Sequence, residues 1–257
     1  MAFQLKIKRS ARNKNSRIIL SLDLSYGKTE NLVSDSIKIL EDSHNYICGL
    51  KINRHIVLPV GLFNGIEKLV KTAHSLDLPT IMDCKINDVG NTNKIIAEYY
   101  FNAGFDAVTV NPFVGWRGGL EPVFEIARRK NRGIILLVYM SHEGSLEGYG
   151  QTVYDPFRKS EKPQYVLFAE KALSWGADGV IVGATYPDKI REVLQILGRK
   201  INIYSPGIGV QGGKIEQSVK MGTDYLIVGR SIFLDAEPAV AAKRIRDTAN
   251  KFFRKRL

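Results

Sequence analysis

Short apolar runs rich in β-branched residues recur along the chain and alternate with longer segments whose apolar residues have helical spacing. In one such helical segment, Ile66, Leu69, Val70 and Ala73 stand three or four residues apart in register. The runs have the length and composition of strands that are buried on both faces, as in a parallel sheet. The eight predicted strands are Arg17–Leu24, Tyr46–Ile52, Thr80–Cys84, Ala107–Val110, Gly133–Val138, Gly179–Val182, Ile201–Tyr204 and Tyr225–Val228.

The alternation of strands and helices predicts the fold class. No hairpin signal joins successive strands, so right-handed βαβ units and a parallel sheet are expected. Eight such units in 257 residues fit an α/β protein with one (β/α)8 TIM barrel. The alternative is an open, doubly wound sheet. The residues after the first strand, 22–27, lack its GxGxxG fingerprint, so the closed barrel is favoured.

One connection is too long for a simple barrel loop. Residues 141–162 read SHEGSLEGYGQTVYDPFRKSEK and show little apolar periodicity. Loops of this length are usually functional lids or disordered segments. Because this one follows the fifth strand, we expect it to overhang the active-site mouth. No linker divides the chain, so we expect a single domain over residues 1–257, with basic extensions at about 1–15 and 245–257.

The positive charge is concentrated at the two ends of the chain. The net charge is +11, and residues 1–17 carry six basic and no acidic residues. Residues 243–257 carry seven basic residues and one acidic residue. The remainder is nearly neutral, so solvated basic ends are the simplest interpretation. Incidental RNA binding through counterion release is conceivable, but no motif indicates a specific nucleic acid partner.

The composition is that of an ordinary globular protein, with 44% hydrophobic and 25% charged residues. The two cysteines, Cys48 and Cys84, cannot form a disulfide framework. No apolar run is long enough to span a membrane, and no apolar stretch follows the basic N-terminus as in a secretory signal. A cytoplasmic location is therefore expected. The four histidines lack metal-ligand spacing, so no metal site is predicted.

Charged residues follow the second and third predicted strands, at the end where barrel enzymes place their active sites. Lys51 stands near the end of the second strand, Asp83 and Lys85 stand at the end of the third, and Asp88 follows shortly afterwards. Asp83 and Lys85 are two residues apart, so both are expected on one face while Cys84 points to the other. Buried charges must be paired, and these four charges sum to zero. We expect an alternating array of ammonium and carboxylate groups. The alternative is a salt-bridge network that only closes the barrel top.

A phosphate site is predicted after the last two strands. The chain reads SPGIGVQGG over residues 205–213 and GRSI over residues 229–232. Barrels commonly bind phosphate in these two loops, and glycines let backbone N–H groups approach an anion closely. Arg230 offers a planar fork that matches phosphate oxygens, and Gln211 could donate one more hydrogen bond. The alternative is that the glycines serve only as turns, but a turn needs no arginine next to Gly229.

Six short motifs occur in a fixed order along the chain. They are Ser-Leu-Asp at 21–23, Leu-Lys-Ile at 50–52, Asp-Cys-Lys-Ile-Asn-Asp-Val-Gly-Asn-Thr at 83–92, Met-Ser-His at 140–142, Ser-Pro-Gly-Ile-Gly-Val-Gln-Gly-Gly at 205–213 and Val-Gly-Arg-Ser-Ile at 228–232. Together they resemble the orotidine 5'-monophosphate decarboxylase family over nearly the whole chain, apart from the basic ends. The resemblance implies a TIM barrel of the ribulose-phosphate-binding type. It also implies a monofunctional, archaeal or bacterial-like enzyme that converts orotidine 5'-monophosphate to UMP and CO2 in pyrimidine synthesis, without a cofactor.

The resemblance also implies a role for each motif residue. Lys85 would protonate C6 of the pyrimidine after CO2 leaves, Asp83 would lie near the substrate carboxylate, and Lys51 would link Asp83 to the ribose. Asp88 and Thr92 would reach into the site of the partner subunit, so a homodimer is implied. The remaining contacts would come from Asp23 to the ribose hydroxyls, Ser141 to the pyrimidine edge, Pro206 to the base, and Gln211, Gly229 and Arg230 to the phosphate.

Two other functions stay open from the sequence. A magnesium-dependent sugar-phosphate decarboxylase or aldolase of the same superfamily would share the Asp-x-Lys-x-x-Asp pattern, but resembles a pattern with a metal-binding glutamate at the position of Lys51. A lysine there would repel a divalent cation. A non-catalytic nucleotide- or RNA-binding barrel would use the basic ends, and would show salt-sensitive polyanion binding without turnover.

Overall fold

A closed barrel forms the centre of the molecule. The computed structural model describes residues 2–24, 31–156 and 158–254. Within these residues, eight parallel strands close the barrel in the order β1-β10-β9-β8-β5-β4-β3-β2. The predicted barrel is confirmed, and the open doubly wound sheet is wrong. The barrel strands are β1 (Ile18–Leu22), β2 (Gly49–Asn53), β3 (Thr80–Ile86), β4 (Ala107–Val110), β5 (Gly133–Tyr139), β8 (Gly179–Val182), β9 (Asn202–Pro206) and β10 (Tyr225–Val228).

The barrel strands coincide with the predicted apolar runs because both of their faces are covered. All seven residues of β5 are buried, since one face packs inside the barrel and the other packs against helices. The bounds differ most usefully at β3, which continues past the predicted end at Cys84 to Ile86. This extension carries Lys85 within the strand.

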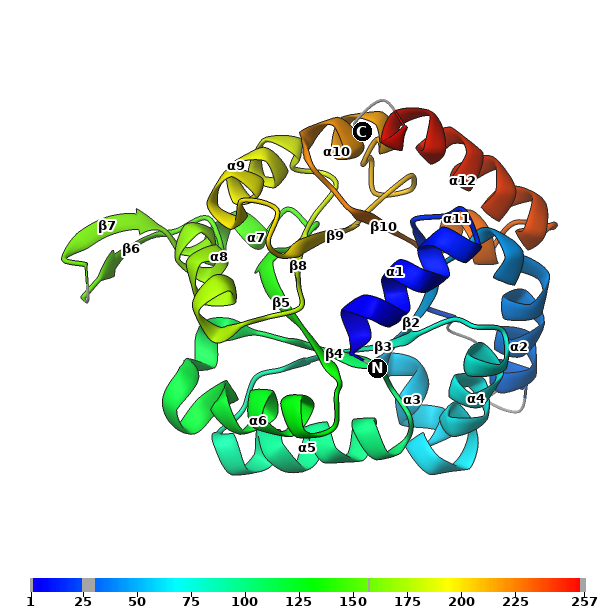
Figure 1. Cartoon of the computed structure of the whole chain (residues 1–257), viewed down its shortest axis with the longest axis horizontal. Helices are drawn as coiled ribbons and strands as arrows, with labels where there is room; N and C mark the ends of the chain where they lie inside the picture. The colour runs from blue at the N-terminus through cyan, green and yellow to red at the C-terminus, as the bar shows by residue number, and fades with distance from the viewer. Residues whose placement is uncertain (1, 25–30, 157, 255–257) are drawn as a thin grey trace.

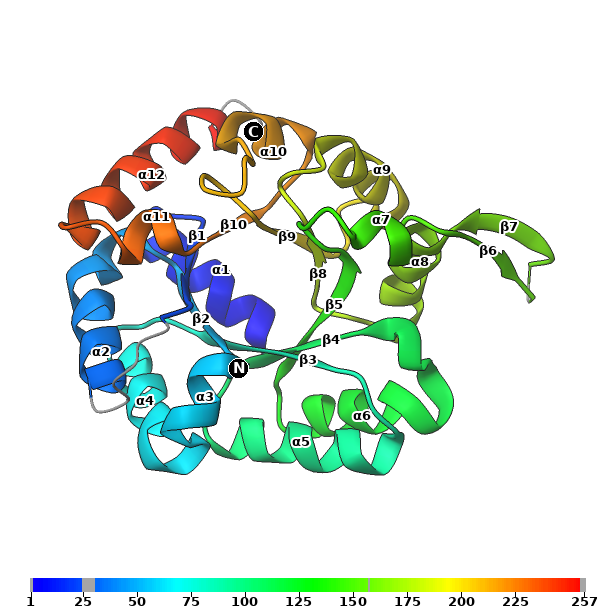
Figure 2. The same ribbon diagram turned by 180° about the vertical axis from the view of Figure 1, so that it is seen from behind.

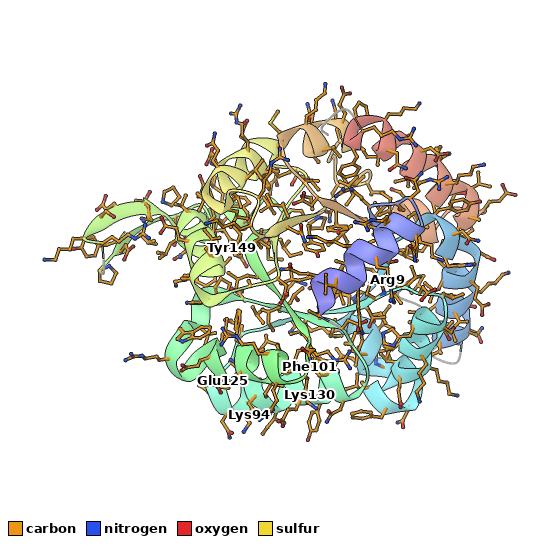
Figure 3. The ribbon with its side chains drawn as sticks, viewed as in Figure 1. Arg9, Lys94, Phe101, Glu125, Lys130 and Tyr149 are labelled. Atoms are coloured by element: carbon orange, nitrogen blue, oxygen red, sulfur yellow. The ribbon has the colours of Figure 1, made fainter. Side chains whose placement is uncertain are left out.

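Helices surround the barrel in an outer ring (Figure 1). Their polar side chains point outward, as Lys94 of α5 and Glu125 of α6 illustrate (Figure 3). No helix in the described part of the chain is both long and apolar enough to cross a membrane. The α-helices are α1 (Phe3–Asn13), α2 (Leu32–Ser43), α3 (Arg54–Val60), α4 (Glu67–Ser75), α5 (Gly90–Asn102), α6 (Glu121–Arg129), α7 (Ser145–Gly148), α8 (Gln164–Trp175), α9 (Pro187–Leu197), α10 (Ile215–Met221), α11 (Arg230–Phe233) and α12 (Pro238–Phe253); short 3-10 or π turns cover η2 (His44–Tyr46), η3 (Leu62–Ile66), η4 (Pro112–Val114) and η5 (Trp116–Leu120).

Helix α1 lies across the end of the barrel where the strands begin (Figures 1 and 2). Phe3 and Ile7 are 1% and 0% exposed, and the Phe3 ring stacks on Tyr204 of β9 at a centroid distance of 6.4 Å. The expected solvated extension is therefore a folded floor of the barrel. Only its outward residues match that expectation, since Lys8 and Arg9 are exposed.

The second basic segment is also part of the folded body. Along α12, Ile245, Ala249 and Phe253 are buried because they share the helix face that packs inward. The guanidinium of Arg17 lies 5.1 Å from the centre of the Phe253 ring, so this helix covers the start of β1. Residues 255–257 of the expected extension lie outside the described residues.

Glycines at the starts of three barrel strands make room for the floor. A Cβ added at Gly133 would lie 2.6 Å from the Phe3 ring, and one at Gly49 would lie 3.1 Å from the Ile7 side chain. A Cβ at Gly179 would lie 2.4 Å from the Tyr204 ring. Side chains at these positions would collide with the aromatic and aliphatic groups that fill the barrel end.

A buried carboxylate ties the floor to the barrel. Asp106 precedes β4 and is 1% exposed. Its carboxylate accepts contacts from Lys6 Nζ at 2.5 Å, His74 Nε2 at 2.8 Å and Arg132 Nη1 at 3.0 Å, and we call these four residues the floor network. Burial alone would raise the pKa of Asp106, but hydrogen bonds from His74, Lys6 and the Thr80 backbone outweigh it and hold the pKa below its ordinary value.

The long connection contains a hairpin, which was not predicted from the sequence. Strand β6 (Thr152–Asp155) pairs with β7 (Ser160–Pro163) in antiparallel register. The hairpin projects sideways, beside α8 (Figure 1), instead of overhanging the mouth. Lys162 anchors it, with Nζ 3.0 Å from the Glu170 carboxylate on α8. The prediction failed because the connecting residues 156–159 show no two-residue turn signature of the Asn-Gly type.

Candidate active site

A cavity of about 590 Å³ opens where the barrel strands end. Its position is set by the parallel strands, because their carboxyl ends all meet at this mouth. Of the residues from 142 to 162, leaving aside 157, none lines the cavity. The predicted site residues that line it are Asp23, Lys51, Asp83, Lys85, Ser141, Pro206, Gln211, Gly229 and Arg230, whereas Asp88 and Thr92 do not.

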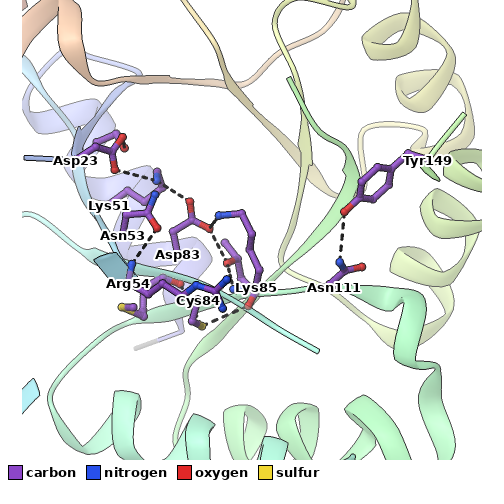
Figure 4. A network of polar contacts seen from close by, with 12 residues as sticks. Asp23, Lys51, Asn53, Arg54, Asp83, Cys84, Lys85, Asn111 and Tyr149 are labelled. Atoms are coloured by element: carbon purple, nitrogen blue, oxygen red, sulfur yellow. Dashed lines mark hydrogen bonds and ion pairs between the residues drawn. The ribbon is translucent and has the colours of Figure 1, made fainter. Parts of the chain in front are cut away.

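Three charged residues form a connected array at the base of the cavity, which we call the mouth network (Lys51, Asp83 and Lys85; Figure 4). Lys51 Nζ donates to Asp83 Oδ2 at 2.7 Å, and Lys85 Nζ donates to Asp83 Oδ1 at 2.8 Å. The Lys51 and Asp83 side chains are 6% and 12% exposed, whereas that of Lys85 is 27% exposed. Lys85 is therefore the cation of the array with the greatest access to the cavity.

The array fixes the charge of its buried members. Burial alone would raise the pKa of Asp83, but Lys51 and Lys85 outweigh it, so the pKa lies well below its ordinary value. Burial alone would lower the pKa of Lys51, but the charges of Asp83 and Asp23 and the hydrogen bond to Asp83 outweigh it and raise the pKa. At neutral pH the carboxylate is ionised and the Lys51 ammonium is protonated.

Asp23 offers a free acceptor at the edge of the same cavity. Its Oδ2 accepts a hydrogen bond from Ser21 Oγ at 2.8 Å. Its Oδ1 is buried and has no hydrogen-bond partner among the described residues, although Lys51 Nζ lies 3.9 Å away. A carboxylate oxygen in this state can accept a hydrogen bond from a ligand hydroxyl.

The backbone at Lys85 departs from regular strand geometry. Its φ of 50° lies in the left-handed region, and the β3–β4 register shifts between Met82 and Ile86. The Lys85 N–H donates to Thr109 Oγ1 on β4 at 2.9 Å, and that hydroxyl donates to Asp83 Oδ1, also at 2.9 Å. Thr109 is not among the predicted site residues, because a threonine inside an apolar strand has no distinguishing signal.

Two further cavity residues were also missed. Asn53 ends β2 and His55 lies in the first turn of α3, and both line the cavity. Asn53 also caps α3, since its Oδ1 accepts from the Arg54 N–H at 2.9 Å. The spacing Lys51-x-Asn53 places Asn53 on the strand face that carries Lys51 and was a usable signal, whereas His55 lies beyond the strand in α3.

The glycine loop after β9 meets the loop after β5. Gly207, Gly209 and Gly212 have φ of 97°, 79° and 90°, so side chains would be strained there. Ser141 Oγ donates to Gln211 Oε1 at 3.0 Å. A Cβ at Gly207 would lie 2.9 Å from that same Gln211 oxygen. Glycine is therefore required for this close contact, which holds Gln211 beside Ser141.

Asp88 and Thr92 stand apart from the array. Asp88 is exposed, and its Oδ1 accepts a hydrogen bond from the Val89 N–H at 2.6 Å. Thr92 is half-buried in the first turn of α5. The expected four-charge array is thus a three-charge array within one chain, with Asp88 directed elsewhere.

The site has two chemically distinct ends. One end holds an ammonium next to a buried carboxylate, which suits proton delivery to a carbon that gains negative charge. The other end combines the glycine loop with exposed Arg230, which suits an anionic ester. In the described part of the chain, no three His, Cys, Asp or Glu side chains are grouped so that they could hold a metal ion.

Comparison with known proteins gives one consistent result. Residues 16–245 match the family described as "Orotidine 5'-phosphate decarboxylase / HUMPS family". An orotidine 5'-phosphate decarboxylase of Methanococcoides burtonii is 32% identical over 237 residues, which cover 92% of this chain and 99% of that protein.

Solved structures share the fold. Orotidine 5'-monophosphate decarboxylase of Methanocaldococcus jannaschii, complexed with the inhibitor BMP, has a TM-score of 0.77 and 26% identity, covering 91% of this chain and 99% of that one. The Leishmania donovani UMP synthase structure has a TM-score of 0.87 and 23% identity. The match covers 98% of this chain but only 57% of the Leishmania chain, and it supports the fold alone.

Proposed function

Because the chain belongs to the orotidine 5'-phosphate decarboxylase / HUMPS family, we propose that it decarboxylates orotidine 5'-monophosphate to UMP and CO2 in pyrimidine synthesis. The proposal rests on one observation: a single cavity is lined both by the mouth network and by Arg230 with the glycine loop. These two features match the reacting carbon and the phosphate of one nucleotide.

In the proposed reaction, the bond between C6 and the carboxylate breaks and its electron pair stays on C6. The Lys85 ammonium, 2.8 Å from Asp83 Oδ1, stabilises this developing charge and then transfers one proton to C6. Neutral Lys85 regains its proton from solvent. In this arrangement Asp83 lies beside the carboxylate that leaves, and repulsion between the two negative charges raises the free energy of the bound substrate. The repulsion is weaker in the transition state, because part of the carboxylate charge has moved to C6.

The remaining cavity residues would bind the nucleotide away from C6. The free Oδ1 of Asp23 suits a ribose hydroxyl, with Lys51 bridging from the array. Ser141 and Pro206 suit the pyrimidine, and Gln211, Gly229 and Arg230 suit the phosphate. Binding energy at the phosphate is remote from C6, so it can align the ring against Lys85.

We also propose that the reaction needs no cofactor. The rival magnesium-dependent enzyme requires an anionic ligand at the end of β2, where this chain has Lys51. Lys51 Nζ lies 2.7 Å from Asp83 Oδ2, so it occupies the carboxylate that a divalent cation would need and repels that cation. Equal turnover with excess chelator and with added magnesium is expected, and strong magnesium dependence would favour the rival.

A homodimer would place Asp88 and Thr92 in the partner subunit's cavity. Neither residue lines the chain's own cavity, and Thr92 lies on α5. Tyr99 of the same helix and Phe63 of η3 are each 54% exposed, and their rings meet edge to face with centroids 6.5 Å apart. Further large apolar side chains are exposed at Leu58 of α3, at Val89 just before α5 and at Ile95 of α5. Exposed apolar residues on neighbouring elements typify an interaction surface, which supports a second copy docking here.

The proposed location is the cytoplasm. Cys48 and Cys84 are both free and buried, and burial raises the pKa of the Cys84 thiol to about 12. Unreactive free thiols suit a reducing compartment. Cell fractionation with an antibody against the chain tests this placement.

Turnover tests the proposed function directly. Chelator-treated protein is incubated with orotidine 5'-monophosphate, and the loss of its ultraviolet absorbance is followed beside the Lys85→Ala variant. We expect rapid loss with the native chain and almost none with the variant. Absence of turnover by the folded native chain would overturn the proposed function, and full turnover by the variant would overturn the proton donor.

Subunit mixing tests the shared site. Lys85→Ala and Asp88→Ala homodimers should each be nearly inactive. Random exchange at equal concentrations makes half of the dimers mixed, and one of the two sites in each mixed dimer is intact, so about a quarter of the native activity should return. No recovery after verified subunit exchange would show that Asp88 acts within its own chain.

A further inference from the structure

Thr109 connects the backbone of Lys85 to the carboxylate that holds its side chain. It lies on β4 and is fully buried. Its hydroxyl accepts a hydrogen bond from the Lys85 N–H and donates one to Asp83 Oδ1, both at 2.9 Å. The hydroxyl therefore donates its proton to Asp83 and offers a lone pair to the Lys85 N–H, so it joins two residues of β3 that stand two positions apart.

Without this hydroxyl, the local geometry of β3 has little support. The φ of 50° at Lys85 is unfavourable for a residue with a side chain. The β3–β4 pairing is interrupted between Met82 and Ile86, so a regular ladder does not hold the Lys85 N–H. Thr109 supplies the missing acceptor from the adjacent strand.

The same hydroxyl also limits how Asp83 can move. Asp83 Oδ2 accepts from Lys51 Nζ at 2.7 Å, whereas Oδ1 accepts from both Lys85 Nζ at 2.8 Å and Thr109. Thr109 is the only neutral member of this set. It fixes the carboxylate plane from β4, so the direction of the Lys85 ammonium is set at both its backbone and its charged end.

We propose that Thr109 is a positioning residue that aims the Lys85 ammonium into the cavity. It touches no part of the cavity itself, because it is not among the lining residues. The inference rests on the proposed function for its kinetic consequence, since aim matters only if Lys85 delivers a proton. Its structural consequence does not depend on which reaction the site performs.

Near-isosteric substitution separates the hydroxyl from the packing. Thr109→Val keeps the branched shape but removes the donor and the acceptor, whereas Thr109→Ser keeps the hydroxyl. We expect Thr109→Val to lower kcat by about 10- to 100-fold with KM within about 2-fold, because misplacing a reacting group by about 1 Å has effects of this size. Thr109→Ser should keep kcat within about 3-fold of the native value, because hydrogen bonding is retained.

Thr80→Val is the matched control. Thr80 begins β3, and its Oγ1 lies 3.4 Å from Asp106 Oδ2 in the floor of the barrel. The change removes a similar hydroxyl next to a similar buried carboxylate, but far from Lys85. We expect kcat and KM to stay at native values. If Thr109→Val does not fold, Thr109→Ala takes its place with the same expectations.

Crystal structures of the variants test the position of Lys85 independently of turnover. In Thr109→Val, Lys85 should leave φ near 50° or Nζ should leave Asp83 Oδ1, and in Thr109→Ser neither should change. Native geometry in Thr109→Val, or equal loss of kcat in the Ser and Val variants, would overturn the proposal. If the native chain does not decarboxylate the nucleotide, the proposed function fails and the crystal structures alone decide the role of Thr109.

Discussion

The two ends of the barrel carry the same electrostatic arrangement for different purposes. At the mouth, Asp83 is held by Lys51 and Lys85. At the floor, Asp106 is held by Lys6, His74 and Arg132. In both places a buried carboxylate has a lowered pKa because cationic groups and hydrogen bonds outweigh burial.

Neither burial nor a shifted pKa distinguishes the two networks. The two networks differ in whether a cavity adjoins them and in the backbone conformation of their residues. The mouth network faces a cavity of about 590 Å³, and Lys85 holds a left-handed φ of 50°. The floor network is covered by α1, whose Phe3 and Ile7 are buried. A cluster of buried charges therefore indicates chemistry only where a cavity and an available proton coincide with it.

The strongest test of this contrast removes one lysine from each end. Lys85→Ala should lower kcat by more than about 10³-fold, because it deletes both the proton donor and the nearby positive charge. Lys6→Ala should leave kcat within about 2-fold, because α1 is far from the mouth and distant sites act independently. The measurement is the steady-state rate of decarboxylation at saturating substrate and 25 °C, on folded protein. A comparable loss in both variants would remove the distinction between the ends.

The reverse asymmetry is expected for stability. Asp106→Asn leaves Lys6, Arg132 and His74 around an uncharged amide, so the free energy of unfolding should fall by about 3 kcal/mol. At a temperature where the variant is folded, its kcat should match that of the native chain. Urea unfolding measures the free energy of unfolding, provided that its dependence on urea concentration has the same slope in both proteins. A large kcat defect without a stability defect would place Asp106 in the catalytic machinery instead.

Acid should weaken the floor by a predictable route. The pKa of Asp106 is lower in the folded chain than in the unfolded one, so the unfolded chain binds the proton first as the pH falls. Its stabilisation is complete above pH of about 4, the ordinary aspartate value, and is lost below it. The difference in the free energy of unfolding between the native chain and Asp106→Asn should stay constant from about pH 5 to 7, because these pH values lie about one unit or more above the ordinary aspartate pKa. The difference should narrow toward about pH 3. A gap that stays constant down to pH 3 would contradict the lowered pKa.

The contrast also explains which features could be predicted from the sequence. Barrel strands such as Gly133–Val138 were recognisable because strands covered on both faces are continuously apolar. The mouth charges were recognisable because Asp83 and Lys85 stand at a strand end with a spacing of two. The floor was not, because the basic residues of α1 concealed the apolar pair Phe3 and Ile7, four residues apart.

Features that depend on contacts between distant segments were out of reach. Thr109 gains its importance only from the register shift in the neighbouring strand, and sequence periodicity does not reveal such a shift. The β6–β7 hairpin is short, partly exposed and anchored by Lys162 to Glu170, so local apolar patterning does not mark it. Asp106 looks like a loop residue until Lys6, 100 positions away, is brought to it.

The smallest expected effect concerns the seating of the floor. In Gly133→Ala, the new Cβ would lie 2.6 Å from Phe3 Cδ1 and 2.7 Å from Phe3 Cβ, so α1 must shift. Overpacking of this kind costs about 1–3 kcal/mol, and kcat should be unchanged because the mouth is at the other end. The same substitution made in Phe3→Ala should cost less, because the contacts with the ring atoms are gone and only the contact with Cβ remains. A double-mutant cycle of urea unfolding measures that coupling. An equal cost in both backgrounds would mean that the Phe3 ring does not occupy the space next to Gly133, and would contradict the packing of α1 against the start of β5.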